Sequence, residues 1–306
     1  MKKLIGKIVT KMDLWAPIWH ARHVGLIKNL EKLSKKESCG YDDITMLCGI
    51  IGSRELVSYS REARESAAKR LYSAISNFTV VKDKFFLDVG TGYGTTVLEF
   101  EKRGAGLSVG IDLVILPVIF KEAAEEHLTC NIIKADIANA PFPDESFDIV
   151  HTNSIEHFTE PYRSFEEMIR ITKKGGLLFL FMRNPYYSPD ASHLYNHVNI
   201  PWSHLLFNHD LLFKFVREHS FEHYGGSPEE YADSTIKQFQ ELNKLDIDDY
   251  KSMIFEASNV KVLHYKEIGA PSPLYEYFYE IFKDKLKNYS KRSLFACGID
   301  AVLKRI

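Results

Sequence analysis

The stretch FFLDVGTGYGTTVLEF, residues 85–100, decides the fold of this chain of 306 residues. The mostly apolar residues 85–89 predict a buried strand, and glycines follow at alternate positions, Gly90, Gly92 and Gly94. Glycine adopts positive φ without strain and lets a ligand approach the backbone closely. A strand, a glycine-rich turn and a helix over 95–103 predict a βα unit whose ligand binds beyond the carboxyl end of the strand.

Two kinds of segment alternate after this stretch. Runs rich in β-forming residues alternate with amphipathic segments, and this alternation predicts βα units and a parallel sheet. The expected strands are 107–112, 131–136, 147–152 and 177–182, and the expected helices are about 115–127 and 161–173. The second of these helices is expected to end at the Gly175–Gly176 pair. A helical stretch over 53–78 precedes the whole series.

The alternation stops after Met182. Residues 183–210 are rich in aromatic residues, His and Pro, which predicts a long insertion of the kind that forms lids and binding loops. Further helices are expected at 209–219, 228–243, 247–257 and 273–288, and further strands at 260–268 and 293–305.

These segments predict an α/β fold. We expect a doubly wound, mostly parallel seven-stranded Rossmann-like sheet, with N-terminal helices and a helical and loop insertion after strand five. The expected division is an N-terminal helical segment at 1–78 and a larger domain at 79–306, whose lid or acceptor insertion lies at about 183–245.

Composition and charge exclude several classes of protein. The net charge of −2 gives no general attraction to nucleic acid, so we expect no nucleic-acid partner. The four cysteines are scattered without CxxC pairing, which argues against a metal cluster or a disulfide framework and favours a reducing cytoplasm. No apolar run reaches the length of about 18 residues that a membrane-spanning helix needs.

Residues 1–36 are basic and carry apolar residues at helical spacing. Such a segment suits peripheral contact with an anionic membrane. The alternative is an amphipathic helix that packs on its own domain or on the second subunit of a homodimer. We favour the packing interpretation, because apolar stripes with Trp usually belong to a protein core.

The spacing of the glycine turn indicates its ligand. A dinucleotide fingerprint reads GxGxxG, but Thr95 stands where the third glycine would be. Asp88, two residues before Gly90, would repel a pyrophosphate and suit a cation. The pattern therefore favours S-adenosylmethionine, whose sulfonium and amino groups are positive, over a nicotinamide cofactor.

The motifs, taken in order, resemble those of the class I S-adenosylmethionine-dependent methyltransferases, with a type 11-like domain. VGIDLV at 109–114, IIKADIANAPFPDESFDIV at 132–150 and NSIEH at 153–157 follow the glycine turn at the family's spacing. The resemblance covers about residues 80–182. It implies that Asp112 binds the ribose hydroxyls and that Asp136 and Ile137 hold the adenine. The cofactor-binding residues that it implies are Asp88, Gly90, Thr91, Gly92, Asp112, Leu113, Asp136, Ile137 and Asn153.

Each acidic residue also has a structural interpretation. Asp112 could cap the following helix, and Asp136 could be an ordinary turn residue. Asp88 could hydrogen-bond amides of the turn without touching the cofactor.

Methyl transfer from a sulfonium needs positioning and exclusion of water more than acid or base catalysis. His157 follows strand four, where the methyl group would point, and is the candidate catalytic base; alternatively it only shapes the cofactor pocket. In the insertion, Tyr187, His193 and His197 are candidate substrate-binding residues. His193 and His197 would suit a metal only on a helix, which the nearby prolines disfavour, so we expect no metal.

The sequence therefore predicts a methyltransferase that acts on an oxygen of a small molecule, a glycan or a lipid-linked intermediate. A non-catalytic module that binds the cofactor is the first alternative, and a nicotinamide-dependent oxidoreductase is the second. The expected location is the cytoplasm. The alternative is a cytoplasmic protein that attaches peripherally to the membrane through residues 1–36.

Overall fold

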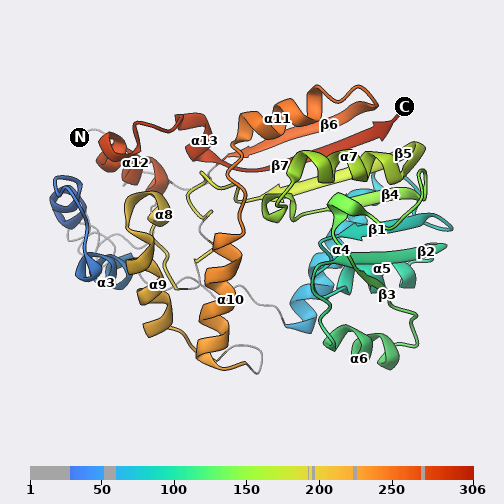
Figure 1. Ribbon diagram of the computed structural model, residues 1–306, viewed down its shortest axis with the longest axis horizontal. Coiled ribbons are helices and arrows are strands. Elements are labelled where there is room, and N and C mark those ends of the chain that lie inside the picture. The colour runs from blue at the N-terminus through green and yellow to red at the C-terminus, as the bar shows by residue number, and fades with distance from the viewer. Residues whose placement is uncertain (1–27, 52–59, 192, 195–196, 223–225, 270–272) are drawn as a thin grey trace, which may run out of the picture. The chain divides into compact units, whose positions relative to one another are not determined.

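The computed structural model describes residues 28–51, 60–191, 193–194, 197–222, 226–269 and 273–306 (Figure 1). The chain forms two compact units. The sheet unit comprises residues 57–185, 241–268 and 298–306, and the helical unit comprises residues 1–56, 186–240 and 269–297. These units do not follow the single boundary expected after residue 78, because the helix before the first strand packs with the sheet and three separate stretches build the helical unit.

The sheet has seven strands in the order β3-β2-β1-β4-β5-β7-β6, which confirms the predicted doubly wound α/β fold. The first four strand pairings are parallel, and β7 runs antiparallel to β5. The strands are β1 (Phe85–Val89), β2 (Leu107–Asp112), β3 (Asn131–Lys134), β4 (Phe147–Thr152), β5 (Thr172–Arg183), β6 (Val260–Gly269) and β7 (Ala296–Arg305). The order reverses between β1 and β4, so the carboxyl ends of these strands form the switch point where ligands of such sheets bind.

Among the described residues of this unit, the α-helices beside the sheet are α4 (Arg61–Ser76), α5 (Thr95–Lys102), α6 (Val118–Glu125), α7 (Pro161–Ile171) and α11 (Ile247–Phe255). Local sequence defines several of their ends. Ser60 caps α4 by accepting from the Ala63 N–H, and Asp246 and Asp249 form a capping box at the start of α11. Pro161 occupies the first turn of α7, where its missing N–H costs nothing.

One hydrophobic cluster of the core lies on one face of the sheet. Phe86 of β1, Ile149 of β4 and Phe179 of β5 are buried there against Ile75 of α4 and Phe100 of α5. The rings of Phe86 and Phe100 stack with their centroids 3.7 Å apart. Alternation of side chains along each strand places these residues on a common face, as the apolar strands predict.

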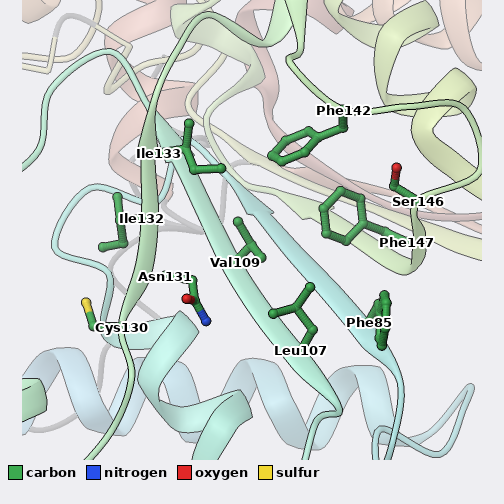
Figure 2. Close-up of a pocket in the computed structure, with 10 residues that line it drawn as sticks. All are labelled: Phe85, Leu107, Val109, Cys130, Asn131, Ile132, Ile133, Phe142, Ser146 and Phe147. Atoms are coloured by element: carbon green, nitrogen blue, oxygen red, sulfur yellow. The ribbon is translucent and has the colours of Figure 1, made fainter.

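The opposite face of β1–β3 is less covered. The connection from β3 to β4, residues 135–146, contains only one short helix, η1 (Ile137–Asn139). A pocket of about 680 Å³ opens on this face, and Figure 2 shows its lining side chains along the strands. Phe85 and Ile133 on this face keep 40% and 37% of their surface exposed.

Several sequence-based boundaries were wrong, and two of these errors concern β3 and β5. β3 ends at Lys134 rather than at residue 136, because Asp136 leaves the strand and caps η1 through its side chain. The Gly175–Gly176 pair lies inside β5 and does not end a helix, since α7 ends at Ile171 and the strand begins at once. Between the pairs Phe147–Thr172 and Ile149–Leu177, β4 advances two residues and β5 five, so the glycines form an irregularity in the strand.

The helical unit contains α3 (Tyr41–Ile51), α8 (Ser203–Leu206), α9 (His209–Glu218), α10 (Pro228–Gln240), α12 (Pro273–Leu286) and α13 (Lys291–Phe295). Trp202 is fully buried in this unit. Its indole N–H lies 3.2 Å from the carbonyl oxygens of both Tyr187 and Leu294, and its backbone N–H donates to Pro189 at 2.9 Å. The predicted insertion is thus held by a buried aromatic anchor with a satisfied N–H.

Most of the basic N-terminal segment, residues 1–27, lies outside the described residues. Its described end packs in the helical unit, where Leu30 and Leu33 are buried and Lys285 donates to the Lys36 carbonyl at 2.6 Å. Among the helices that the structure describes, none combines the length and the apolar character needed to cross a membrane.

Candidate functional site

The turn after β1 contains three glycines with positive φ: Gly90 at 72°, Gly92 at 51° and Gly94 at 68°. The Gly90 N–H donates to the Ile111 carbonyl of β2 at 2.9 Å, and the Gly94 N–H donates to the Thr91 carbonyl at 2.9 Å. Gly94 then precedes the first residue of α5. The turn is therefore closed by its own backbone and lies at the carboxyl ends of β1 and β2.

The three glycines differ in the space around their α-carbons. A Cβ added at Gly90 would lie 2.8 Å from the Cβ of Ser154, and one added at Gly94 would lie 2.6 Å from the Cδ1 of Ile132. A Cβ added at Gly92 would meet no protein atom within 4 Å. The packing of the protein thus requires Gly90 and Gly94, and Gly92 is the position that leaves space for a ligand.

Asp112, the last residue of β2, faces the same turn. Its Oδ2 accepts from the Gly92 N–H at 2.8 Å, and its Oδ1 accepts from the Val114 N–H at 3.0 Å. It does not cap α6, whose N-cap is Pro117. Each carboxylate oxygen can accept more than one hydrogen bond, so this geometry still suits two ribose hydroxyls. The ribose contact itself stays a prediction.

Asp136 follows β3 at the same edge of the sheet. Its Oδ1 accepts from the Ala138 N–H at 2.9 Å and caps η1. One carboxylate oxygen of Asp136 therefore has the local hydrogen bond that is expected of a turn residue. Ile137 beside it is 5% exposed, and the predicted adenine contacts of both residues are not tested by these bonds.

Leu113 and Asn153, two further predicted cofactor residues, are both exposed. Leu113 follows β2 and keeps 59% of its surface exposed. Asn153 follows β4, and its Oδ1 accepts from the Ser154 hydroxyl at 3.1 Å. Because Ser154 also lies against Gly90, the loops after β1 and β4 meet at this edge.

Asp88 supports the glycine turn from within the sheet. It is 4% exposed and lies opposite His151 in the parallel pair of β1 and β4. Its Oδ1 is 2.7 Å from the His151 Nδ1, and its Oδ2 accepts from the Thr91 hydroxyl at 2.9 Å. The carboxylate therefore fixes the turn through Thr91, while its predicted contact with the cofactor stays a prediction.

Sequence reasoning missed His151, although a histidine within the apolar run FDIVHT was a usable signal. We expect His151→Phe, which keeps a ring and removes the donor, to lower the free energy of unfolding by about 1–3 kcal/mol, because a buried carboxylate oxygen loses its partner. Urea unfolding measures this loss. Thr91→Val, which removes the donor of the other oxygen, is the matched variant, and equal stability of both variants and the parent would contradict the support role.

Arg64 of α4 holds the start of α5 through a hydrogen bond. It is a second residue that the sequence did not reveal. Its guanidinium donates to the Thr95 hydroxyl at 2.7 Å and pairs with the Glu122 carboxylate at 2.5 Å. The same guanidinium lies 4.6 Å from the ring centre of Tyr93 in the turn. Thr95, which replaces the third glycine of a dinucleotide fingerprint, is therefore used to hold a helix.

The loop after β4 forms a short helix, η2 (Ile155–His157). Glu156 is buried there, with 5% of its surface exposed. Burial raises the pKa of Glu156 to about 8, against the opposing effects of its own backbone N–H and of the Arg183 charge. Burial also lowers the pKa of His157 to about 4. The base role predicted for His157 stays a prediction.

Asn243, from the segment that precedes α11, holds this loop in place. Its side-chain amide donates to the Ile155 carbonyl at 2.8 Å and to the Phe158 carbonyl at 3.1 Å, and its backbone N–H donates to the Glu156 carbonyl at 2.8 Å. The Tyr250 hydroxyl donates to the Asn243 Oδ1 at 2.7 Å. No sequence motif indicated this support, because it joins segments about 90 residues apart.

A family model described as a methyltransferase domain matches residues 87–180, from within β1 to within β5. This range contains the glycine turn, Asp112, Asp136 and η2. The chain contains a class I S-adenosylmethionine-dependent methyltransferase domain. The family predicted from the motifs is thereby confirmed, and S-adenosylmethionine is the cofactor of such domains.

Curated relatives match the same part of the chain. A ubiquinone/menaquinone biosynthesis C-methyltransferase, UbiE of Bdellovibrio bacteriovorus, is 30% identical over 115 residues, which cover 36% of this chain and 48% of the relative. Cycloartenol-C-24-methyltransferase of Arabidopsis thaliana is 26% identical over 117 residues, which cover 37% of this chain and 35% of that protein. The chain spans about half the length, or less, of these relatives.

Among solved structures, a geranyl diphosphate C-methyltransferase from Streptomyces coelicolor in complex with Mg²⁺, geranyl diphosphate and S-adenosylhomocysteine is 15% identical to the chain. The match covers 83% of this chain and 86% of that one, with a TM-score of 0.47.

The predicted substrate-binding residues all belong to the helical unit rather than to the methyltransferase domain. His197 lies 3.3 Å from the Ser220 hydroxyl and packs on the ring of Phe221. Tyr187 packs on the ring of Tyr289. His193 has a positive φ of 53°. Their roles toward a substrate stay predictions.

The pocket of Figure 2 lies away from the candidate cofactor edge of the methyltransferase domain. Phe85, Leu107, Asn131 and Phe147, which line it, are the first residues of their strands. The glycine turn and the carboxylates follow the last residues of the same strands. This pocket is therefore not the cofactor site.

Proposed function

We infer that the protein transfers a methyl group from S-adenosylmethionine to a hydroxyl oxygen of a small molecule, a glycan or a lipid-linked intermediate. The observation that carries this inference is the position of Asp112, whose carboxylate ends β2 and accepts from the Gly92 N–H at 2.8 Å. Asp136 follows the neighbouring strand, β3, at the same edge. Two carboxylates around an open glycine suit a positively charged nucleoside and disfavour a pyrophosphate.

The reaction requires little from the protein beyond position. The acceptor oxygen forms a bond to the methyl carbon while the carbon–sulfur bond breaks, which leaves neutral S-adenosylhomocysteine. The hydroxyl proton passes to water or to a nearby base. Holding the two reactants in line removes entropic cost that the free reaction would meet.

Support for an oxygen acceptor comes from the loop after β4. This loop contains a carboxyl group and an imidazole, Glu156 and His157, on consecutive residues of η2. Such polar groups interact favourably with an acceptor that carries hydroxyls. Carbon is the second candidate atom, because the two curated relatives named above are C-methyltransferases.

The proposal is tested with cofactor that carries a ¹³C-labelled methyl group. The full chain is incubated with this cofactor and with cell extract separated into glycan, lipid and small-metabolite pools. We expect label in one pool, with the carbon resonance of a methyl group bonded to oxygen. A methyl bonded to carbon would replace the oxygen assignment by the second candidate.

Binding experiments separate the remaining alternatives. S-adenosylhomocysteine is expected to bind in calorimetry, and NADH is not. Binding of S-adenosylhomocysteine without label transfer to any pool would indicate a non-catalytic module. Binding of NADH without binding of S-adenosylhomocysteine would support the oxidoreductase hypothesis instead.

A further inference from the structure

The buried carboxyl group of Glu156 has one oxygen atom, Oε2, without a hydrogen-bond partner among the described residues. The positive charge that acts on it belongs to Arg183, whose guanidinium is 2.8 Å from the Asp300 carboxylate. A buried polar atom that is left unsatisfied costs free energy, and in native proteins such an atom calls for an explanation, of which a bound ion is one.

The position of this carboxyl group is well defined. The carbonyls of Ile155, Glu156 and Phe158 all accept hydrogen bonds from Asn243, and Asn243 in turn accepts from Tyr250. Residues of α11 and of the segment before it thus hold a loop whose central side chain keeps one carboxyl oxygen, Oε2, without a hydrogen-bond partner among the described residues. Such outer support is typical of groups that bind a ligand in a fixed geometry.

His157 provides a second donor atom next to the first. A ring nitrogen of His157 and a carboxylate oxygen of Glu156 lie within 4.8 Å of each other. Two ligands of one ion, each about 2.0–2.2 Å from it, are separated by about 3–4 Å. Small side-chain rotations therefore bring both atoms onto one cation.

We propose that Glu156 and His157 together bind a divalent cation in the loop after β4. The unsatisfied carboxylate oxygen and the imidazole nitrogen are its protein ligands within the methyltransferase domain, and a set of one carboxylate and one imidazole suits Mn²⁺ or Zn²⁺. Water or acceptor oxygens occupy the other positions. This assignment revises the sequence-based expectation of no metal.

The role that we assign to the cation rests on the proposed function, and it makes that function more specific. A cation at this loop orients an acceptor that carries neighbouring oxygen atoms and favours loss of the proton from the coordinated hydroxyl. His157 then acts as a ligand instead of a base. The substrate class narrows to acceptors with at least two adjacent oxygen ligands, such as a diol or a hydroxy acid.

The experiment measures Mn²⁺ binding to the full chain after treatment with a chelator and dialysis. The electron paramagnetic resonance signal of free Mn²⁺ is followed as protein is added, and Zn²⁺ is tested by competition. We expect one ion per chain. Glu156→Gln keeps the shape of the side chain and removes its charge, and we expect it to weaken binding at least about tenfold, since even an outer partner of a metal ligand contributes roughly 10–100-fold. His157→Ala is expected to do the same.

Glu160→Gln is the matched control, because Glu160 lies four residues further along the same loop and is 58% exposed. It is expected to bind Mn²⁺ like the parent. Thermal unfolding with and without Mn²⁺ reports whether each variant is folded, and only proteins with Glu156 and His157 are expected to gain stability from the ion. No Mn²⁺ or Zn²⁺ uptake by the parent, or equal uptake by Glu156→Gln, would overturn the proposal.

Failure of this inference is distinguishable from failure of the proposed function. Mn²⁺ binding is measured without cofactor or acceptor, and S-adenosylhomocysteine binding is measured separately without Mn²⁺. A parent that binds S-adenosylhomocysteine and takes up no cation overturns the metal site alone. A parent that takes up the cation through Glu156 and His157 but transfers no labelled methyl overturns the proposed activity and leaves the site in place.

Discussion

Replacing Asp112 by alanine is expected to weaken the binding of S-adenosylhomocysteine by roughly tenfold to a hundredfold. Hydrogen bonds to a charged group contribute about 1.5–3 kcal/mol, and each 1.4 kcal/mol is about a factor of ten in affinity. The structure adds a second reason for a large effect. The same carboxylate holds the Gly92 N–H at 2.8 Å, so the variant loses both the predicted ribose contact and an anchor of the glycine turn. Isothermal titration calorimetry measures the change.

Two further variants make this result interpretable. Asp112→Asn retains a carbonyl oxygen that can accept from one backbone N–H, so its loss of affinity is expected to be smaller than that of the alanine variant. Glu166→Ala removes an exposed carboxylate from α7 and is expected to leave the affinity unchanged. If all three variants bind S-adenosylhomocysteine like the parent, the assignment of Asp112 to the ribose is wrong.

The second large effect concerns the glycines of the turn, because the structure separates their roles. Gly90→Ala is expected to lower the free energy of unfolding by about 2–5 kcal/mol. A non-glycine residue at positive φ costs about 1–2 kcal/mol, and the added Cβ, 2.8 Å from the Cβ of Ser154, adds about 1–3 kcal/mol of overpacking. Urea unfolding followed by circular dichroism measures the loss.

Gly92→Ala is expected to behave differently. Its Cβ meets no protein atom within 4 Å, so only the cost of the positive φ remains in the free protein. The added methyl group occupies the space predicted for the cofactor, and about 1.4 kcal/mol of overpacking in the complex weakens S-adenosylhomocysteine binding about tenfold. The measurement is again calorimetry, with stability determined in parallel.

Gly104→Ala is the control for backbone strain. Gly104 has a φ of 84°, and a Cβ there would lie 3.7 Å from the Cγ of Lys82, in ordinary contact and outside the turn. This variant is expected to lose about the same stability as Gly92→Ala while keeping cofactor affinity. Equal affinities of the Gly92 and Gly104 variants would show that Gly92 does not face the cofactor.

The sequence by itself determined the sheet and the class of ligand. Runs of apolar and β-forming residues together with the glycine turn identified β1, β2 and β4 to the residue, because strand propensity and turn chemistry are local properties. The sequence-based prediction of a helix end at Gly175–Gly176 was wrong, because a glycine pair that stops a helix and a glycine pair that forms a strand irregularity look alike in sequence. The difference is set by pairing with β4, which is not a local property.

Only the tertiary structure decided what the buried polar groups do. Asp88 was a candidate cofactor residue by its place in the chain, and its contact with His151 became visible only when β1 and β4 lay side by side. Glu156 appeared in a motif, but its missing partner and its support by Asn243 depend on segments far apart in sequence. Burial and hydrogen-bond partnership arise from the packing of distant segments, so no local pattern of residues records them.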